Sequence, residues 1–134
     1  MIEINGLSKY YGPIKAVKNI NFSISDGEIV GFLGANGAGK STTLKILSGY
    51  LAPTNGKVKI NGLDIEKDSL AIRKIIGYLP ENNPLYFDMN VYELLKFTAN
   101  IRNIKGNEFN IALDKVVKQC GLKGVLHKQI GECS

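Results

Sequence analysis

The sequence has 134 residues, 44% of them hydrophobic, which fits one soluble domain, or part of one, with a real core. No window approaches 18 consecutive apolar residues, and no basic segment followed by an apolar one opens the chain, so neither a transmembrane helix nor a secretory signal is expected. The two cysteines lack CxxC spacing, which argues against a metal site or a disulfide framework and fits a reducing compartment. The net charge is +5, and its lysines are scattered along the chain, so they fit a solvated surface as well as a basic binding face.

The residue pattern in the first third of the chain predicts β-strands. Ile2 and Ile4 alternate with polar residues, and a second alternating run contains Val17, Ile20, Phe22 and Ile24. With a turn signal at residues 26–28, these runs predict a small antiparallel sheet. Residues 29–33 form a near-continuous apolar run, which is typical of a strand buried on both faces.

The middle of the chain alternates between helix and strand signals. A helix is predicted from residue 40, with Leu44 and Leu47 on one face and Gly49 at its end. The pairs Asn55-Gly56 and Asn61-Gly62 are predicted turns that flank a strand over residues 57–60. A short helix over residues 69–75, capped by Asp68 or Ser69, and a strand over residues 76–81, ended by Pro80, should follow.

Two amphipathic helices are predicted in the last third. In the first, over residues 91–101, apolar side chains recur at helical spacing, and Asn90 with Glu93 resembles a capping box. In the second, the apolar positions run from Phe109 to Cys120, after Gly106-Asn107 separates the two helices. Cys120 is therefore predicted to pack in a core, and the lone histidine, His127, to lie at the surface.

Residues 34–41 match the pattern G-x-x-x-x-G-K-[ST] at every fixed position. Small residues allow successive backbone N–H groups to turn inward around an anion, and the helix that follows adds the positive end of its dipole. Lysine brings a compact charge to the β- and γ-phosphates, and the serine hydroxyl is a ligand that magnesium accepts. The predicted nucleotide-binding residues are Gly34, Asn36, Gly37, Ala38, Gly39, Lys40, Ser41 and Thr42.

The stretches LGANGAGKSTTLKILSG, PTNGKVKINGLDI and IGYLPE, in this order, resemble the ATP-binding subunit of an ABC transporter over essentially the whole chain. GTPases and small-molecule kinases share the loop but not the Pro-Thr-x-Gly hairpin after its helix. The resemblance implies an α/β P-loop NTPase of the ABC-ATPase type: a small antiparallel β-subdomain, an incomplete parallel core sheet and the start of a helical subdomain. Within this partial nucleotide-binding domain (1–134), it implies that residues 1–81 form the ATP-binding core and β-subdomain and 82–134 the incomplete helical subdomain.

The resemblance also assigns residues that contact the base. Tyr11 matches the family's adenine-stacking aromatic residue, and a tyrosine face can stack on a purine without base-specific hydrogen bonds. Tyr10, one position earlier, is the alternative candidate for the adenine-stacking residue. Val17 is similar to the position that packs against the base edge, although an ordinary core valine is an equally good interpretation.

Glu81 departs from the family pattern, since it occupies a position where the family usually has glutamine near magnesium and the attacking water. An ionised carboxylate only accepts hydrogen bonds, yet it can bind magnesium directly or through water. The resemblance thus gives Lys40 and Glu81 as catalytic residues and Ser41 and Glu81 as magnesium ligands; a solvated loop carboxylate is the alternative for Glu81. The substitution resembles a subset of exporter subunits, including the gliding-motility-associated type.

The same resemblance implies ATP and Mg²⁺ as ligands, and a transmembrane permease and a second nucleotide-binding subunit as partners. It implies a cytoplasmic subunit, peripheral on the inner face of the plasma membrane, with no nucleic acid expected. A loop rich in apolar side chains fits contact with the permease as well as core packing: it contains Leu85, Tyr86, Phe87 and Met89.

Cys133 and Ser134 align with the first two residues of the family's Leu-Ser-Gly-Gly-Gln signature. The rest of the signature, the magnesium-binding aspartate, the catalytic glutamate and the switch histidine match nothing in these residues. We therefore expect the 134 residues to bind ATP without efficient turnover and to expose an apolar sheet edge. Two other hypotheses for the function are an ATPase of the same fold that acts in translation or DNA repair, and a non-catalytic nucleotide-binding module.

Overall fold

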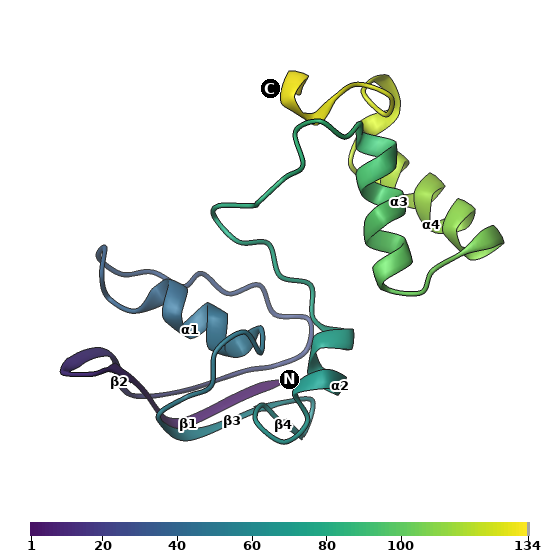
Figure 1. Ribbon diagram of the computed structural model, residues 1–134. Helices are drawn as coiled ribbons and strands as arrows, with labels where there is room; N and C mark the ends of the chain where they lie inside the picture. Colours follow the sequence, from purple (N-terminus) through teal and green to yellow (C-terminus); the bar gives the residue numbers. More distant parts are fainter. Residues whose placement is uncertain (134) are drawn as a thin grey trace. The chain divides into compact units, whose positions relative to one another are not determined.

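The first part of the chain forms a four-stranded antiparallel sheet with the strand order β2-β1-β3-β4 (Figure 1). The computed structural model describes residues 1–133. β1 (Ile2–Tyr11) pairs with β2 (Ile14–Ile24) on one side and with β3 (Asn55–Ile60) on the other, and β4 (Leu63–Asp64) adds to β3. The alternating apolar patterns predicted this small antiparallel sheet, and it is confirmed.

The chain divides into two compact units, Met1–Leu79 and a second that begins at Pro80. The first contains the sheet, α1 (Lys40–Leu47) and α2 (Ser69–Ile75). The second contains α3 (Val91–Ile101), α4 (Gly106–Gln119) and two single 3-10 turns, η1 (Leu122–Gly124) and η2 (Ile130–Glu132). Among the helices of residues 1–133, none has the length and apolar character needed to span a bilayer.

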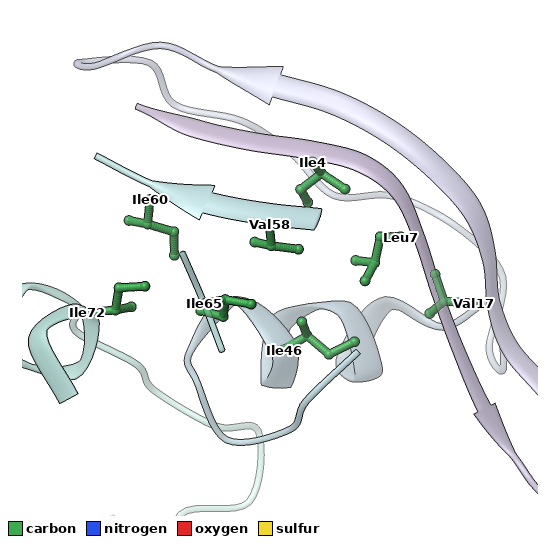
Figure 2. Close-up of a cluster of buried hydrophobic side chains, with 8 residues drawn as sticks. All are labelled: Ile4, Leu7, Val17, Ile46, Val58, Ile60, Ile65 and Ile72. Carbon is green, nitrogen blue, oxygen red and sulfur yellow. The ribbon is translucent and has the colours of Figure 1, made fainter. Parts of the chain in front are cut away.

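The core of the first unit lies between the sheet and its two helices (Figure 2). Ile46 of α1 and Ile72 of α2 are completely buried, because each helix packs against the sheet through the side on which this residue lies. Side chains of one face of the sheet, and of the segment after β4, meet them: Ile4, Leu7, Val17, Val58, Ile60 and Ile65. This packing sets the position of α1, whose first residue ends the phosphate loop.

One of the two predicted Asn-Gly turns is confirmed and the other is wrong. Asn61 and Gly62 join β3 to β4 with φ values of 51° and 80°, as a type I′ hairpin turn requires. Asn55-Gly56 instead opens β3. A Cβ on Gly56 would lie 2.4 Å from the Gly6 carbonyl oxygen, so this glycine permits close approach of β1 where the strand register is irregular.

The two strands predicted for a parallel core sheet do not form within residues 1–133. Residues 29–33 and 76–81 lie in no strand. Ile29 and Leu33, predicted to be buried, are 102% and 92% exposed, and Leu79 is 81% exposed. A strand buried on both faces needs paired strands at its edges and elements packed on its faces. Among residues 1–133 no strand pairs with these segments, although the Phe32 ring lies 5.8 Å from that of Phe22 on β2.

The second unit begins with an extended segment and then forms its helices. Asn90 and Glu93 make the predicted capping box, with both side chain–backbone hydrogen bonds at 2.9 Å. α4 starts at Gly106, earlier than the apolar pattern suggested, and Phe109 is its buried residue. Cys120, predicted to pack in a core, is exposed, because it follows the last residue of α4 at the C-cap. His127 is exposed as predicted.

Replacing Ile46 with alanine should lower the free energy of unfolding by about 2–5 kcal/mol, because it removes a completely buried side chain between α1 and the sheet. Leu44→Ala in the same helix is the matched control: Leu44 is 44% exposed, and its loss should cost about 0.5 kcal/mol. Urea unfolding followed by circular dichroism measures both. Equal effects of the two substitutions would contradict this account of the core.

Candidate phosphate-binding site

The loop of residues 34–39 leads directly into α1 and is shaped by glycines. Gly37 and Gly39 have φ values of 83° and 87°, in the left-handed region that other residues rarely adopt. Between them, the Ala38 N–H donates to the Ala35 carbonyl at 3.1 Å, which closes a tight turn. The side chains of this turn are exposed, so the loop is accessible to a ligand.

The side chain of Lys40 folds back over the loop that precedes it. Its ammonium donates to the carbonyl oxygens of Gly34 at 2.5 Å and Ala35 at 2.7 Å. Lys40 is partly exposed, so the charge remains accessible although its direction is set. The single positive charge of the motif is thus held within the loop instead of extending into solvent.

The end of the loop lies against β2 with no space for a side chain. A Cβ on Gly39 would lie 2.3 Å from the Ala16 carbonyl oxygen and 2.9 Å from Cγ2 of Val17. The Gly39 carbonyl in turn accepts two hydrogen bonds from Thr43, one from its N–H and one from its hydroxyl, each at 2.9 Å. Thr43 is 1% exposed. Together these contacts hold the loop between the sheet and the first turn of α1.

The start of α1 offers several hydrogen-bond donors. The N–H groups of Lys40, Ser41 and Thr42 lie in the first turn, where a helix supplies no acceptor, and the described residues show no other acceptor for them. The Ser41 hydroxyl is exposed beside them. Amide donors, an ammonium group and a hydroxyl fit phosphate oxygens with a shared magnesium ion, so the donor set suits the ligand that the motif predicted.

The two candidate stacking tyrosines differ in exposure. Tyr11 is 45% exposed at the end of β1, while Tyr10 is partly buried and its N–H donates to the Thr54 hydroxyl at 3.0 Å. Tyr11 pairs with Ile14 across the hairpin, close along β2 to the residues that contact Gly39. Exposure and register favour Tyr11, whose contact with a base stays a prediction.

The remaining predicted site residues are less directly placed. Val17 is 5% exposed in the core of the first unit, and its Cγ2 would lie 2.9 Å from a Cβ on Gly39; its contact with a base edge stays a prediction. Glu81 is exposed near the start of the second unit, and its roles also stay predictions. Cys133 is exposed, and Ser134 lies outside the described residues.

The apolar loop of the second unit is open to solvent. Leu85, Tyr86 and Phe87 are 36%, 56% and 63% exposed, and Met89 is partly buried. The Tyr86 ring packs edge-on against Phe97 of α3 with the ring centroids 5.7 Å apart. These side chains form no buried core among the described residues, and the contact of this loop with a permease stays a prediction.

Two residues of the site were missed from the sequence. Thr43, to which the sequence patterns assign no role, is buried and its hydroxyl donates to the Gly39 carbonyl. Lys9 was not singled out, although its ammonium lies 5.5 Å from the centroid of the Tyr11 ring. The period-two rule for strands puts residues 9 and 11 on one face and offered a signal for Lys9; no local pattern marked Thr43.

Comparison with known proteins adds independent findings. The profile of a family described as "ABC transporter" matches residues 17–134. The probable multidrug ABC transporter ATP-binding protein YbhF of Escherichia coli is 35% identical over 93% of the chain and 22% of its own length. The bacitracin transport ATP-binding protein BcrA of Bacillus licheniformis is 35% identical over 100% of the chain and 43% of its own.

A solved structure described as the dimeric, post-hydrolysis state of the ATP-binding cassette MJ0796 bound to ADP and Pi matches with a TM-score of 0.84. The identity is 26%, over 100% of the chain and 63% of that structure. This match confirms the predicted fold class of an ABC-type ATPase domain. The chain spans less than half the length of the two curated relatives above.

Two glycine substitutions separate backbone strain from lack of space in the loop. Gly37→Ala should lower the free energy of unfolding by about 1–2 kcal/mol, the cost of a side chain at positive φ, since no atom of residues 1–133 crowds its Cβ position within 4 Å. Gly39→Ala should cost about 1–3 kcal/mol more, because its Cβ would also overlap Ala16. Urea unfolding compares them, and equal losses would contradict the contact with β2.

Proposed function

The chain belongs to the ABC transporter family, and from that premise we propose that it binds MgATP through residues 34–42 as part of the energy-coupling subunit of a membrane transporter. ATP hydrolysis in the complete subunit would drive the transport step. The names of the relatives support this role, since YbhF and BcrA are each described as the ATP-binding protein of a transport system.

The position of the Lys40 ammonium is the observation that carries the proposal. It is held on the carbonyl oxygens of Gly34 and Ala35, beside an accessible turn and the unpaired N–H groups at the start of α1. Phosphate oxygens at this place would replace the carbonyl contacts with stronger hydrogen bonds, because the acceptor as well as the ammonium donor would then be charged. The similar solved structure of MJ0796, described as bound to ADP and Pi, supports nucleotide as the ligand.

Five of the predicted site residues, together with the backbone of the loop, would have distinct roles toward the bound nucleotide. The backbone N–H groups of the loop and α1 hold the phosphates, and Lys40 stabilises the negative charge that phosphoryl transfer spreads over the γ-phosphate oxygens. Magnesium, when bound, neutralises phosphate charge; the Ser41 hydroxyl and the Glu81 carboxylate are the oxygen ligands proposed for it. Val17 and Tyr11 are proposed to contact the base.

The partners follow from the same premise. We propose a transmembrane permease as one partner, with the exposed loop that contains Leu85, Tyr86 and Phe87 as its contact surface. A second nucleotide-binding subunit is the other, which the dimeric solved structure supports. The subunit would then be cytoplasmic and peripheral on the inner face of the membrane, with no nucleic-acid partner.

Lys40→Ala should weaken MgATP binding at least about tenfold, because it removes a charge-assisted contact to the phosphates, while the fold is retained. Lys45→Ala is the matched control: it removes the same charge from an exposed position in the last turn of α1. Isothermal titration calorimetry measures both affinities. No MgATP binding by the unsubstituted chain, or equal loss in both variants, would contradict the proposed function.

Tyr11→Ala should weaken ATP binding about 5- to 50-fold, within the range of one lost base–aromatic stack, and leave the affinity for inorganic tripolyphosphate unchanged. Tyr10→Ala should leave both affinities near those of the unsubstituted chain, because Tyr10 is partly buried on β1. Competition with a fluorescent ATP analogue gives the affinities of the unsubstituted chain and the two variants for ATP and for tripolyphosphate. The reverse order of the two variants would move the stacking role to Tyr10.

A further inference from the structure

The end of β1 is tied to the segment between α1 and β3 by three hydrogen bonds. The Lys9 ammonium donates to the Ala52 carbonyl at 2.8 Å, and the Tyr10 N–H donates to the Thr54 hydroxyl at 3.0 Å. The Thr54 N–H donates to the Ser8 carbonyl at 2.9 Å. Three consecutive strand residues are therefore held from one side, immediately before the exposed Tyr11.

Lys9 makes a second contact with the same ammonium group. Its nitrogen lies 5.5 Å from the centroid of the Tyr11 ring, within the distance at which a cation is attracted to the face of an aromatic ring. Because Ala52 holds the ammonium, the lysine cannot follow the ring if the tyrosine changes rotamer, so the contact favours one ring orientation. A ring with a cation on one face still offers its opposite face, and Tyr11 is 45% exposed.

We propose that Lys9 is a positioning residue for base recognition: tethered to Ala52, it holds the Tyr11 ring in the orientation that stacks on the purine of the nucleotide. The inference rests on the proposed function of the site. A pre-oriented ring loses less rotamer freedom when the base binds, and the cation attracts the ring without touching the nucleotide.

Two features of binding follow from a stacking role without base-specific hydrogen bonds. ATP and GTP should depend on Lys9 to the same degree, because every purine has a π-face. A ligand without a base should not depend on Lys9. A lysine that attracted the phosphates would behave differently, since its loss would weaken every polyphosphate, with or without a base.

The decisive variant is Lys9→Met, which keeps most of the aliphatic stem and removes the charge. We expect its ATP and GTP affinities to fall about 3- to 10-fold, within the range of a cation–π contact, with tripolyphosphate affinity changed less than about twofold. Lys9→Arg can still donate to Ala52 and lie over the ring, so it should restore both nucleotide affinities. Lys15→Met, in the exposed neighbouring position of β2, removes the same charge and should change nothing.

A double substitution distinguishes positioning from a structural role. In a Tyr11→Ala background, Lys9→Met should have no further effect on ATP affinity, because the ring on which it acts is gone. Calorimetry gives the affinities, and urea unfolding of each variant shows whether the fold is altered.

Each other outcome has a defined meaning. A parallel fall in tripolyphosphate affinity, a loss without rescue by arginine, or an unchanged ATP affinity in Lys9→Met would overturn the inference and leave the proposed function intact. Failure of the unsubstituted chain to bind ATP would overturn both. If Lys9→Met also unfolds at lower urea and binds tripolyphosphate weakly, the lysine is structural and the inference is wrong.

Discussion

The candidate site depends on one contact in which two backbones meet without an intervening side chain. Gly39 lies so close to the Ala16 carbonyl of β2 that a Cβ would be 2.3 Å from the oxygen. Protein interiors are close-packed, so such an approach sets the distance between two elements with little tolerance. The phosphate loop is not part of the antiparallel sheet, yet the sheet determines where the loop ends and α1 begins.

From that fixed point the loop and the helix are held by different forces. Ile46, further along α1, is buried against the sheet and holds the helix by apolar packing. Thr43 donates twice to the Gly39 carbonyl, and the N–H groups of residues 40–42 have no acceptor among the described residues because they lie in the first turn of the helix. The Lys40 ammonium balances the inward-facing carbonyls of the loop. A loop held against the sheet, N–H donors at the start of a helix and one ammonium group held beside them are the properties that phosphate binding requires.

The predictions from sequence succeeded where a residue's role is local. The capping box of Asn90 and Glu93 and the type I′ turn at Asn61-Gly62 formed as predicted, because each depends on residues within a few positions. Residues 29–33 were predicted as a doubly buried strand and are exposed, since a strand of that kind needs paired strands at its edges and no strand of residues 1–133 pairs with this segment. Gly56 was misassigned to a turn because its function is to approach Gly6 on another strand.

The amino-acid sequence by itself determined the chemistry of the site: the glycines, lysine and serine of the loop, their spacing and their family. These are properties of a short segment whose backbone conformations and donor groups are set by residue type. Tertiary structure alone decided that Gly39 meets Ala16, that Tyr11 is more exposed than Tyr10, and that Lys9 links Ala52 to the Tyr11 ring. Those contacts join residues up to 43 positions apart, and their geometry depends on strand register and packing, which no local pattern encodes.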